Sequence, residues 1–221
     1  MILPASFYQR ENVVQISQQL LGKVLVTYID GQYTSGIIVE TEAYNGYNDL
    51  ACHAHGKRTN RTETMYSEGG MAYIYLCYGI HHLFNVVTNE KEKADAVLIR
   101  AIEPLEGLDI MISRRKKEKI DYKLTQGPGS LSQALGIHTS MMGTSLINKK
   151  KIWIEDRDNK VSETQIVSSL RVGVGYARED ALLPWRFYLK ENPWVSRREK
   201  NLDEKIQKFG LAKGDKLKVS D

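Results

Sequence analysis

Cysteines and long apolar runs are both scarce in this chain. Only Cys52 and Cys77 occur among its 221 residues, which excludes a disulfide-stapled scaffold. No uncharged apolar run reaches the ~18 residues of a membrane-spanning helix. The first residues, MILPASFYQRENVV, lack the basic and apolar regions of a signal peptide. We therefore expect a cytoplasmic protein that makes no membrane contact.

Proline, low-complexity sequence and charge of one sign are also limited. Five prolines and no biased tract argue against long disordered segments. Lysine plus arginine total 31 against 27 for aspartate plus glutamate, and the net charge of +4 permits an anionic partner without requiring one. A chain of this length suits one core, so residues 1–221 are predicted to form a single domain, with a peripheral charged tail from about residue 197.

The spacing of apolar and turn residues predicts strands joined by hairpins, with helices between them. Asp30-Gly31 and Gly79 mark the two hairpin turns. Strands are expected at residues 23–29, 33–44, 71–78, 82–88, 95–102, 151–155, 166–172 and 186–190, and helices at 11–21, from Pro104 onward and at 127–136. The polar residues 45–70 form a loop of a length typical of functional loops. The pattern predicts an α+β fold with a curved, largely antiparallel sheet and surrounding helices.

Two carboxylates and an aromatic ring are predicted to share one face of the strand GIIVETEAY. Strict alternation places Ile37, Val39, Thr41 and Ala43 on a core face and Ile38, Glu40, Glu42 and Tyr44 on the other face. A solvated strand face would explain one glutamate equally well.

Arg100 favours a chemical role for one of these carboxylates. It ends the run AVLIR, where both faces of the strand look buried. Because arginine is rarely buried unpaired, a carboxylate on a neighbouring strand is the expected partner. An arginine beside Glu42 would favour its ionised form. An ionised glutamate in an apolar cleft has the properties of a general base.

Aromatic residues gather in the segment that follows the long loop. Tyr73 and Tyr75 point to one face of their strand, and Tyr78 lies at the hairpin tip. If Tyr44 and Tyr75 face one cleft, they could hold a planar ring between them; core packing is the simpler alternative for both. Tyr78 is either merely exposed or an aromatic wedge on a tight turn, the device that separates stacked base pairs.

Signals for metals and nucleotide cofactors are weak. His53 and His55 lie two positions apart, next to Cys52, but zinc usually takes three or four ligands and no second cluster is present. Gly173 and Gly175 have no third glycine at dinucleotide-binding spacing, and GPGS at 127–130 lacks the Lys-Ser/Thr pair of a phosphate loop. We expect no metal and no cofactor.

Eight segments in order give the chain a specific likeness. They are LLGKVLV, GIIVETEAYNG, DLACHAHGKRT, GGMAYIYLCYGIHHLFNVV, VLIRAIEPLEGL, GPGSLSQALGI, RVGVGYA and WRFYLKENPWVS. With these segments the chain resembles the alkyladenine (3-methyladenine) DNA glycosylases from about residue 17 to residue 197. The resemblance implies a monofunctional repair enzyme without metal or redox cofactor. Its partner would be double-stranded DNA containing damaged purines, and we expect a cytoplasmic, nucleoid-associated monomer.

The resemblance also implies roles by position. Glu42 matches the general base, Arg100 the residue that helps to hold the attacking water, and the main-chain carbonyl of Val172 a third contact to that water. The base pocket corresponds to Tyr44, His53 and Tyr75, which match the residues that stack on and hydrogen-bond the flipped base. Asn85 matches the side chain that excludes guanine. Tyr78 matches the residue that fills the gap in the duplex.

Some positions depart from the family pattern, and two other functions stay open. RTNRT replaces the common RTPRN, Leu83 stands where cysteine is frequent, and Ser130 stands where a basic residue is common. A non-catalytic module that recognises distorted duplexes through Tyr78 would leave Glu42 and Arg100 unexplained. An unrelated small-molecule hydrolase or transferase with a glutamate base would have no affinity for duplex DNA.

Overall fold

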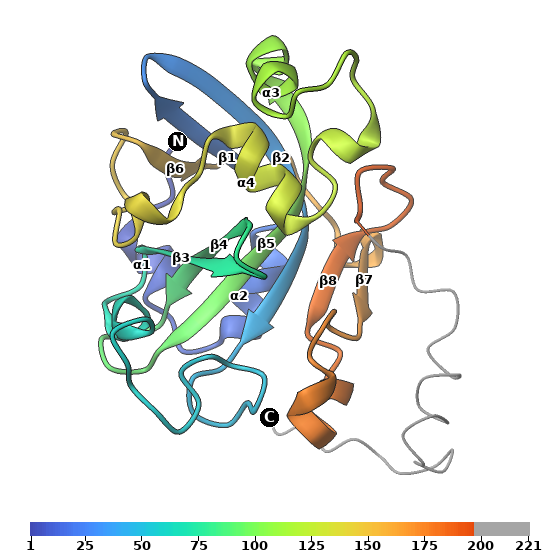
Figure 1. Cartoon of the computed structure of the whole chain (residues 1–221). Coiled ribbons are helices and arrows are strands. Elements are labelled where there is room, and N and C mark those ends of the chain that lie inside the picture. The colour runs from blue at the N-terminus through green and yellow to red at the C-terminus, as the bar shows by residue number, and fades with distance from the viewer. Residues whose placement is uncertain (197–221) are drawn as a thin grey trace.

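One antiparallel sheet organises the chain. The computed structural model describes residues 1–196 (Figure 1). Its strands are β1 Val24–Ile29, β2 Gln32–Tyr44, β3 Ala72–Cys77, β4 His81–Thr88, β5 Asp95–Glu106, β6 Ile152–Glu155, β7 Ile166–Ser169 and β8 Arg186–Leu189. The order is β3-β4-β5-β2-β1-β6, with β8 paired to both β2 and β7, and every one of these pairs is antiparallel.

Short helices cover this sheet. The α-helices are α1 Ala5–Tyr8, α2 Val13–Gln19, α3 Leu108–Arg114 and α4 Pro128–Leu135, and the 3-10 helices are η1 Glu63–Tyr66, η2 Tyr122–Leu124, η3 Thr139–Met141, η4 Glu163–Gln165 and η5 Gly175–Leu182. The main core joins Ile16 of α2 and Leu131 of α4 to Ile38 and Ile99 of the sheet. The predicted α+β fold around a largely antiparallel sheet is confirmed.

Both predicted hairpin turns form. Asp30 and Gly31 have φ angles of 52° and 74° and join β1 to β2 with Ile29 opposite Gln32. Positive φ at both central residues is the geometry that the twist of a tight hairpin requires. Tyr78 and Gly79, with φ angles of 51° and 75°, turn β3 into β4.

The long strand β2 divides the sheet. One of its edges pairs with β5 over nearly its whole length. Its other edge pairs first with β1, through residues 32–37, and then with β8, through residues 40–42. The sheet therefore forks at this point and brings β7 and β8 beside the end of β2, as Figure 1 shows in orange beside the blue strand.

The predicted strict alternation of β2 is wrong at Val39. The β2–β5 register shifts between Ile38 and Glu40 and shifts back between Glu40 and Thr41, so that Val39 and then Arg100 are the extra residues of two compensating bulges. A bulge places consecutive side chains on one side of a sheet. Ile38 therefore joins Ala43 in the main core, whereas Ile37 and Val39 pack in a separate cluster on the opposite face.

Two further predictions need correction. No helix begins at Pro104, because β5 continues to Glu106 and α3 starts at Leu108. Pro104 lies near the end of β5, next to a register shift, where a missing N–H costs little. The predicted strand 166–172 ends at Ser169.

The tail from residue 197 lies outside the described residues. Within residues 1–196, no helix is both long and apolar enough to span a membrane.

Candidate active site

A pocket of about 490 Å³ opens at the end of β2. The β3–β4 hairpin, the loop after β2 and residues 172–176 surround it. Seven of the eight residues proposed from the sequence line it, namely Tyr44, His53, Tyr75, Tyr78, Asn85, Arg100 and Val172. A larger cavity of about 840 Å³ lies on the other side of the same loop, but none of the proposed residues lines it. The smaller pocket is therefore the candidate site.

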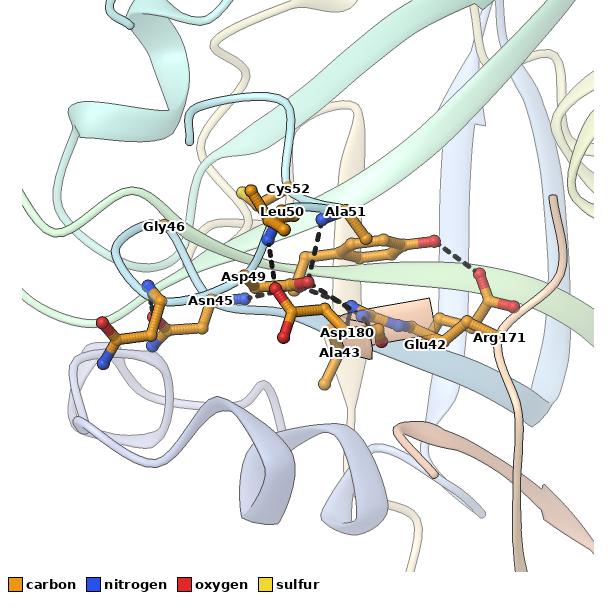
Figure 2. Close-up of polar contacts among 12 residues, drawn as sticks. Glu42, Ala43, Asn45, Gly46, Asp49, Leu50, Ala51, Cys52, Arg171 and Asp180 are labelled. Carbon is orange, nitrogen blue, oxygen red and sulfur yellow. Dashed lines mark hydrogen bonds and ion pairs between the residues drawn. The ribbon is translucent and has the colours of Figure 1, made fainter. Parts of the chain in front are cut away.

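Glu42, the eighth residue, lies fully buried behind the pocket wall. Its Oε1 accepts a hydrogen bond from the Val172 amide at 2.7 Å and lies 3.2 Å from Nη1 of Arg100. Its Oε2 accepts a hydrogen bond from the Tyr44 hydroxyl at 2.7 Å (Figure 2). Because Arg100, Val172 and Tyr44 all line the pocket, the carboxylate lies directly behind its floor. The predicted proximity of Glu42 and Arg100 is confirmed.

Glu40 is a second buried carboxylate, not a solvated one. Its Oε1 accepts hydrogen bonds from Nε of Arg100 at 2.9 Å and Nε of Arg186 at 2.8 Å, and its Oε2 accepts from the Ser196 amide at 2.6 Å. Burial raises the pKa of Glu40, but the two guanidinium groups and Ser196 outweigh burial, so the pKa is lowered. Glu40 therefore stays ionised and fixes Arg100, which lies between the two carboxylates.

Tyr44 serves both the carboxylate and the pocket wall. Burial, together with the adjacent negative charge of Glu42, raises the pKa of its hydroxyl well above the ordinary value. The hydroxyl therefore remains protonated and donates to Glu42 at neutral pH. The Tyr44 ring lies 4.9 Å from the guanidinium carbon of Arg171 and also lines the pocket.

His53, Tyr73 and Tyr75 form an aromatic cluster in the pocket wall. The His53 and Tyr75 rings meet edge to face at 4.5 Å, the Tyr73 and Tyr75 rings stack at 5.8 Å, and Nδ1 of His53 lies 3.1 Å from the Tyr73 hydroxyl. Desolvation, followed by the positive charge of Arg61, lowers the pKa of His53 to about 4. Both effects favour a neutral imidazole at pH 7.

Asn85 and Tyr78 also line the pocket, one buried and one exposed. Asn85 of β4 is only 4% exposed, and its Nδ2 donates to the carbonyls of Tyr73 at 3.1 Å and Leu83 at 3.3 Å. These bonds fix the amide at the pocket wall. Tyr78 is 90% exposed at the hairpin tip, beside the exposed Ile80. An exposed aromatic ring held at a fixed point by a tight turn has the geometry of a wedge.

A buried ion pair that the sequence analysis missed holds the two loops of the site together. Nη2 of Arg171 donates to Oδ1 of Asp49 at 2.8 Å, and its Nη1 donates to the other carboxylate oxygen. Arg171 also donates to the carbonyls of Ala43 at 2.9 Å and Asp180 at 3.0 Å (Figure 2). The two charges are 122 positions apart, so local sequence patterns gave no signal that they pair.

The two histidines next to Cys52 do not converge. His53 lines the candidate site, whereas His55 lines the larger cavity on the other side of the loop. Within the described part of the chain, no three histidine, cysteine, aspartate or glutamate side chains lie close enough to hold a metal ion. Burial raises the pKa of the Cys52 thiol to about 12, so the thiol is protonated at neutral pH.

Comparison with known sequences identifies the class of protein that carries this site. The pattern of the methylpurine-DNA glycosylase family matches residues 6–193. The chain is 50% identical over 190 residues to a protein of Chlamydia abortus, an alignment that covers 85% of this chain and 98% of that protein. A protein of Clostridium perfringens is 43% identical over 206 residues, or 90% and 100% of the two chains. Both relatives are named as candidate 3-methyladenine DNA glycosylases.

These matches span nearly the whole described structure and nearly all of each relative. The chain belongs to the methylpurine-DNA glycosylase family. By family it is a DNA glycosylase, a hydrolase of base excision repair.

Proposed function

We propose that the protein flips damaged purines out of duplex DNA and hydrolyses their N-glycosidic bond with a water molecule activated by Glu42. The substrates are purines of the 3-methyladenine, 7-methylguanine, hypoxanthine and ethenoadenine class, and the product is an abasic site. The observation that carries the proposal is the buried Glu42 carboxylate, held by Arg100, Tyr44 and the Val172 amide behind an aromatic pocket.

The aromatic walls suit a flipped base. Extruding a nucleotide from the stack costs a few kcal/mol, and stacking on aromatic side chains can return ~1–3 kcal/mol per base. Tyr44, Tyr75 and His53 all line the pocket, and the His53 and Tyr75 rings meet edge to face. The fixed amide of Asn85 would clash with the exocyclic amine of guanine and thereby exclude the normal base.

The carboxylate and its partners supply the hydrolysis. The water oxygen attacks C1′, the C1′–N9 electron pair leaves with the base, and Glu42 takes the water proton. The Arg100 guanidinium and the Val172 carbonyl are proposed to orient the water. The negative charge of Glu42 also stabilises the positive charge that develops on the sugar.

Two features support a monofunctional enzyme that works on duplex DNA. No lysine lines the pocket within residues 1–196, so no amine is placed to form a Schiff base with C1′. Tyr78, exposed at the hairpin tip, would fill the gap that the flipped nucleotide leaves in the duplex. Nothing in this arrangement requires a second subunit, and we propose a monomer.

A gel assay on lesion-bearing oligonucleotides tests the proposal. The protein should convert hypoxanthine- or ethenoadenine-containing duplexes into abasic sites that break only after alkali treatment, and borohydride should trap no covalent complex. Strand cleavage without alkali, together with a trapped complex, would contradict the monofunctional mechanism. Salt-dependent binding without any abasic product would identify a non-catalytic binder of distorted duplexes.

A further inference from the structure

Arg61 lies in the candidate pocket but has no part in the hydrolysis described above. It lies in the polar loop, just before η1, and its side chain lines the pocket together with that of Arg100. Its guanidinium carbon lies 5.2 Å from the centre of the Tyr75 ring. A guanidinium in this position faces the same aromatic wall against which a flipped base would stack.

The charges around the pocket balance except at Arg61. Two carboxylates, Glu40 and Glu42, lie against two guanidinium groups, Arg100 and Arg186, and the four together carry no net charge. The Asp49 and Arg171 pair is likewise neutral.

Arg61 itself forms no ion pair with any carboxylate among residues 1–196. Its neighbour Arg58 pairs with both Glu63 and Glu92, and these three residues keep a net negative charge but do not line the pocket. Since His53 is neutral at pH 7, the pocket lining has one positive charge, Arg61, without an ion-pair partner.

This charge acts on several groups of the pocket wall. The positive charge of Arg61 contributes to the low pKa of His53. Burial raises the pKa of the Tyr73 and Tyr75 hydroxyls, and the charge of Arg61 acts to lower it. The same field would act on a base held between these rings, because like charge disfavours a cationic ligand and favours a negative one.

We propose that Arg61 is a specificity-determining residue that favours excision of neutral damaged purines over cationic alkylated purines. The inference rests on the proposed function and names the preferred substrate class of the same site. A purine methylated at N7 is cationic and leaves C1′ as a neutral base. A neutral purine such as hypoxanthine takes the electron pair of the C1′–N9 bond and leaves as an anion.

The pocket supplies little else to stabilise such an anion. His53 lies in the wall, but an imidazole with a pKa of about 4 is not protonated at neutral pH and cannot act as an acid. Arg61 is permanently charged and touches the stacking ring Tyr75. Its charge therefore raises the barrier for binding a cationic base and lowers the barrier for departure of a neutral one.

Single-turnover excision of two lesions by three proteins tests the inference. Hypoxanthine and 7-methylguanine are placed in the same duplex sequence, and the wild type is compared with Arg61→Gln and Arg61→Lys. Because Arg61 is exposed and solvent screens its charge, we expect Arg61→Gln to lower the hypoxanthine to 7-methylguanine rate ratio only roughly tenfold, or about 1.4 kcal/mol. Arg61→Lys should keep the ratio near that of the wild type.

Arg58→Gln is the matched control, since it removes an arginine from the same loop that lines only the other cavity. Its rate ratio should equal that of the wild type. An unchanged ratio in Arg61→Gln, or an equal fall for both lesions as expected of a phosphate contact, would overturn the inference. A wild-type protein that releases neither base would instead contradict the proposed function itself, so the two failures are distinguishable.

Discussion

The buried Asp49–Arg171 pair gives a sharp test of what holds the site together. Asp49 and Arg171 have no exposed side-chain surface in this pair. The carboxylate accepts two bonds from the guanidinium and one from the Ala51 amide at 2.9 Å. Asp49→Asn keeps the shape of the side chain but removes its charge, so the Arg171 charge is left uncompensated in the interior.

The expected loss of stability is large. Removing one partner of a buried ion pair costs about 3–5 kcal/mol, because the remaining charge has lost both its partner and its water. For a chain of this size, 1 kcal/mol shifts the melting temperature by about 2–4 °C. Asp49→Asn should therefore melt roughly 6–20 °C below the wild type.

Urea unfolding of four proteins measures this cost. The control Asp121→Asn removes an exposed partner of Lys117, at 2.8 Å, and should lower the stability far less than Asp49→Asn. The double variant Asp49→Asn, Arg171→Met leaves no uncompensated charge and should regain part of the loss. Equal stabilities for Asp49→Asn and Asp121→Asn would refute the reasoning.

Three other outcomes follow from the structure. The free energy of unfolding of Tyr78→Ala should lie within about 0.5 kcal/mol of the wild-type value, because the ring is exposed. The variant should nevertheless bind lesion duplexes less tightly in gel shifts, and unchanged binding would exclude a wedge. Gly46→Ala should destabilise the fold by about 1–3 kcal/mol in urea unfolding, since its new Cβ would lie 2.3 Å from the Lys93 carbonyl oxygen. In the control Gly175→Ala the new Cβ meets no atom within 4 Å, so this variant should unfold like the wild type. Because the fold lowers the pKa of His53 from 6.5 to about 4, the unfolded chain takes up that proton first, so stability should fall as pH drops through this range, and less so in His53→Gln.

Local patterns were sufficient for the hairpins and for the proximity of the catalytic candidates. Asp30 and Gly31 adopt the positive φ angles that their residue types predict, and the register follows from the turn. The buried Arg100 in an apolar strand correctly indicated a carboxylate on the neighbouring strand. These inferences work because a turn or a buried charge imposes its requirement within a few residues or one strand pair.

Features that depend on distant partners were not predictable. The bulge at Val39 reverses which residues of β2 face the core. Valine occurs in regular strands as well, so the residue type alone does not reveal the bulge. A solvated face stayed open for one glutamate of β2 because Arg186, a partner of Glu40, is 146 positions away. The exposed fraction of a charged residue thus depends on which strand the fold brings beside it, as β8 is brought beside β2.

The central claim is that the Glu42 carboxylate activates water, and Glu42→Gln tests it most directly. The amide oxygen can still accept from the Val172 amide, and Glu40 still pairs with Arg100, so the variant should fold. Single-turnover excision of hypoxanthine should fall by a factor of ~10²–10⁴ while binding to the same duplex persists, with Glu118→Gln as an exposed control. Excision at the wild-type rate by Glu42→Gln would contradict the account.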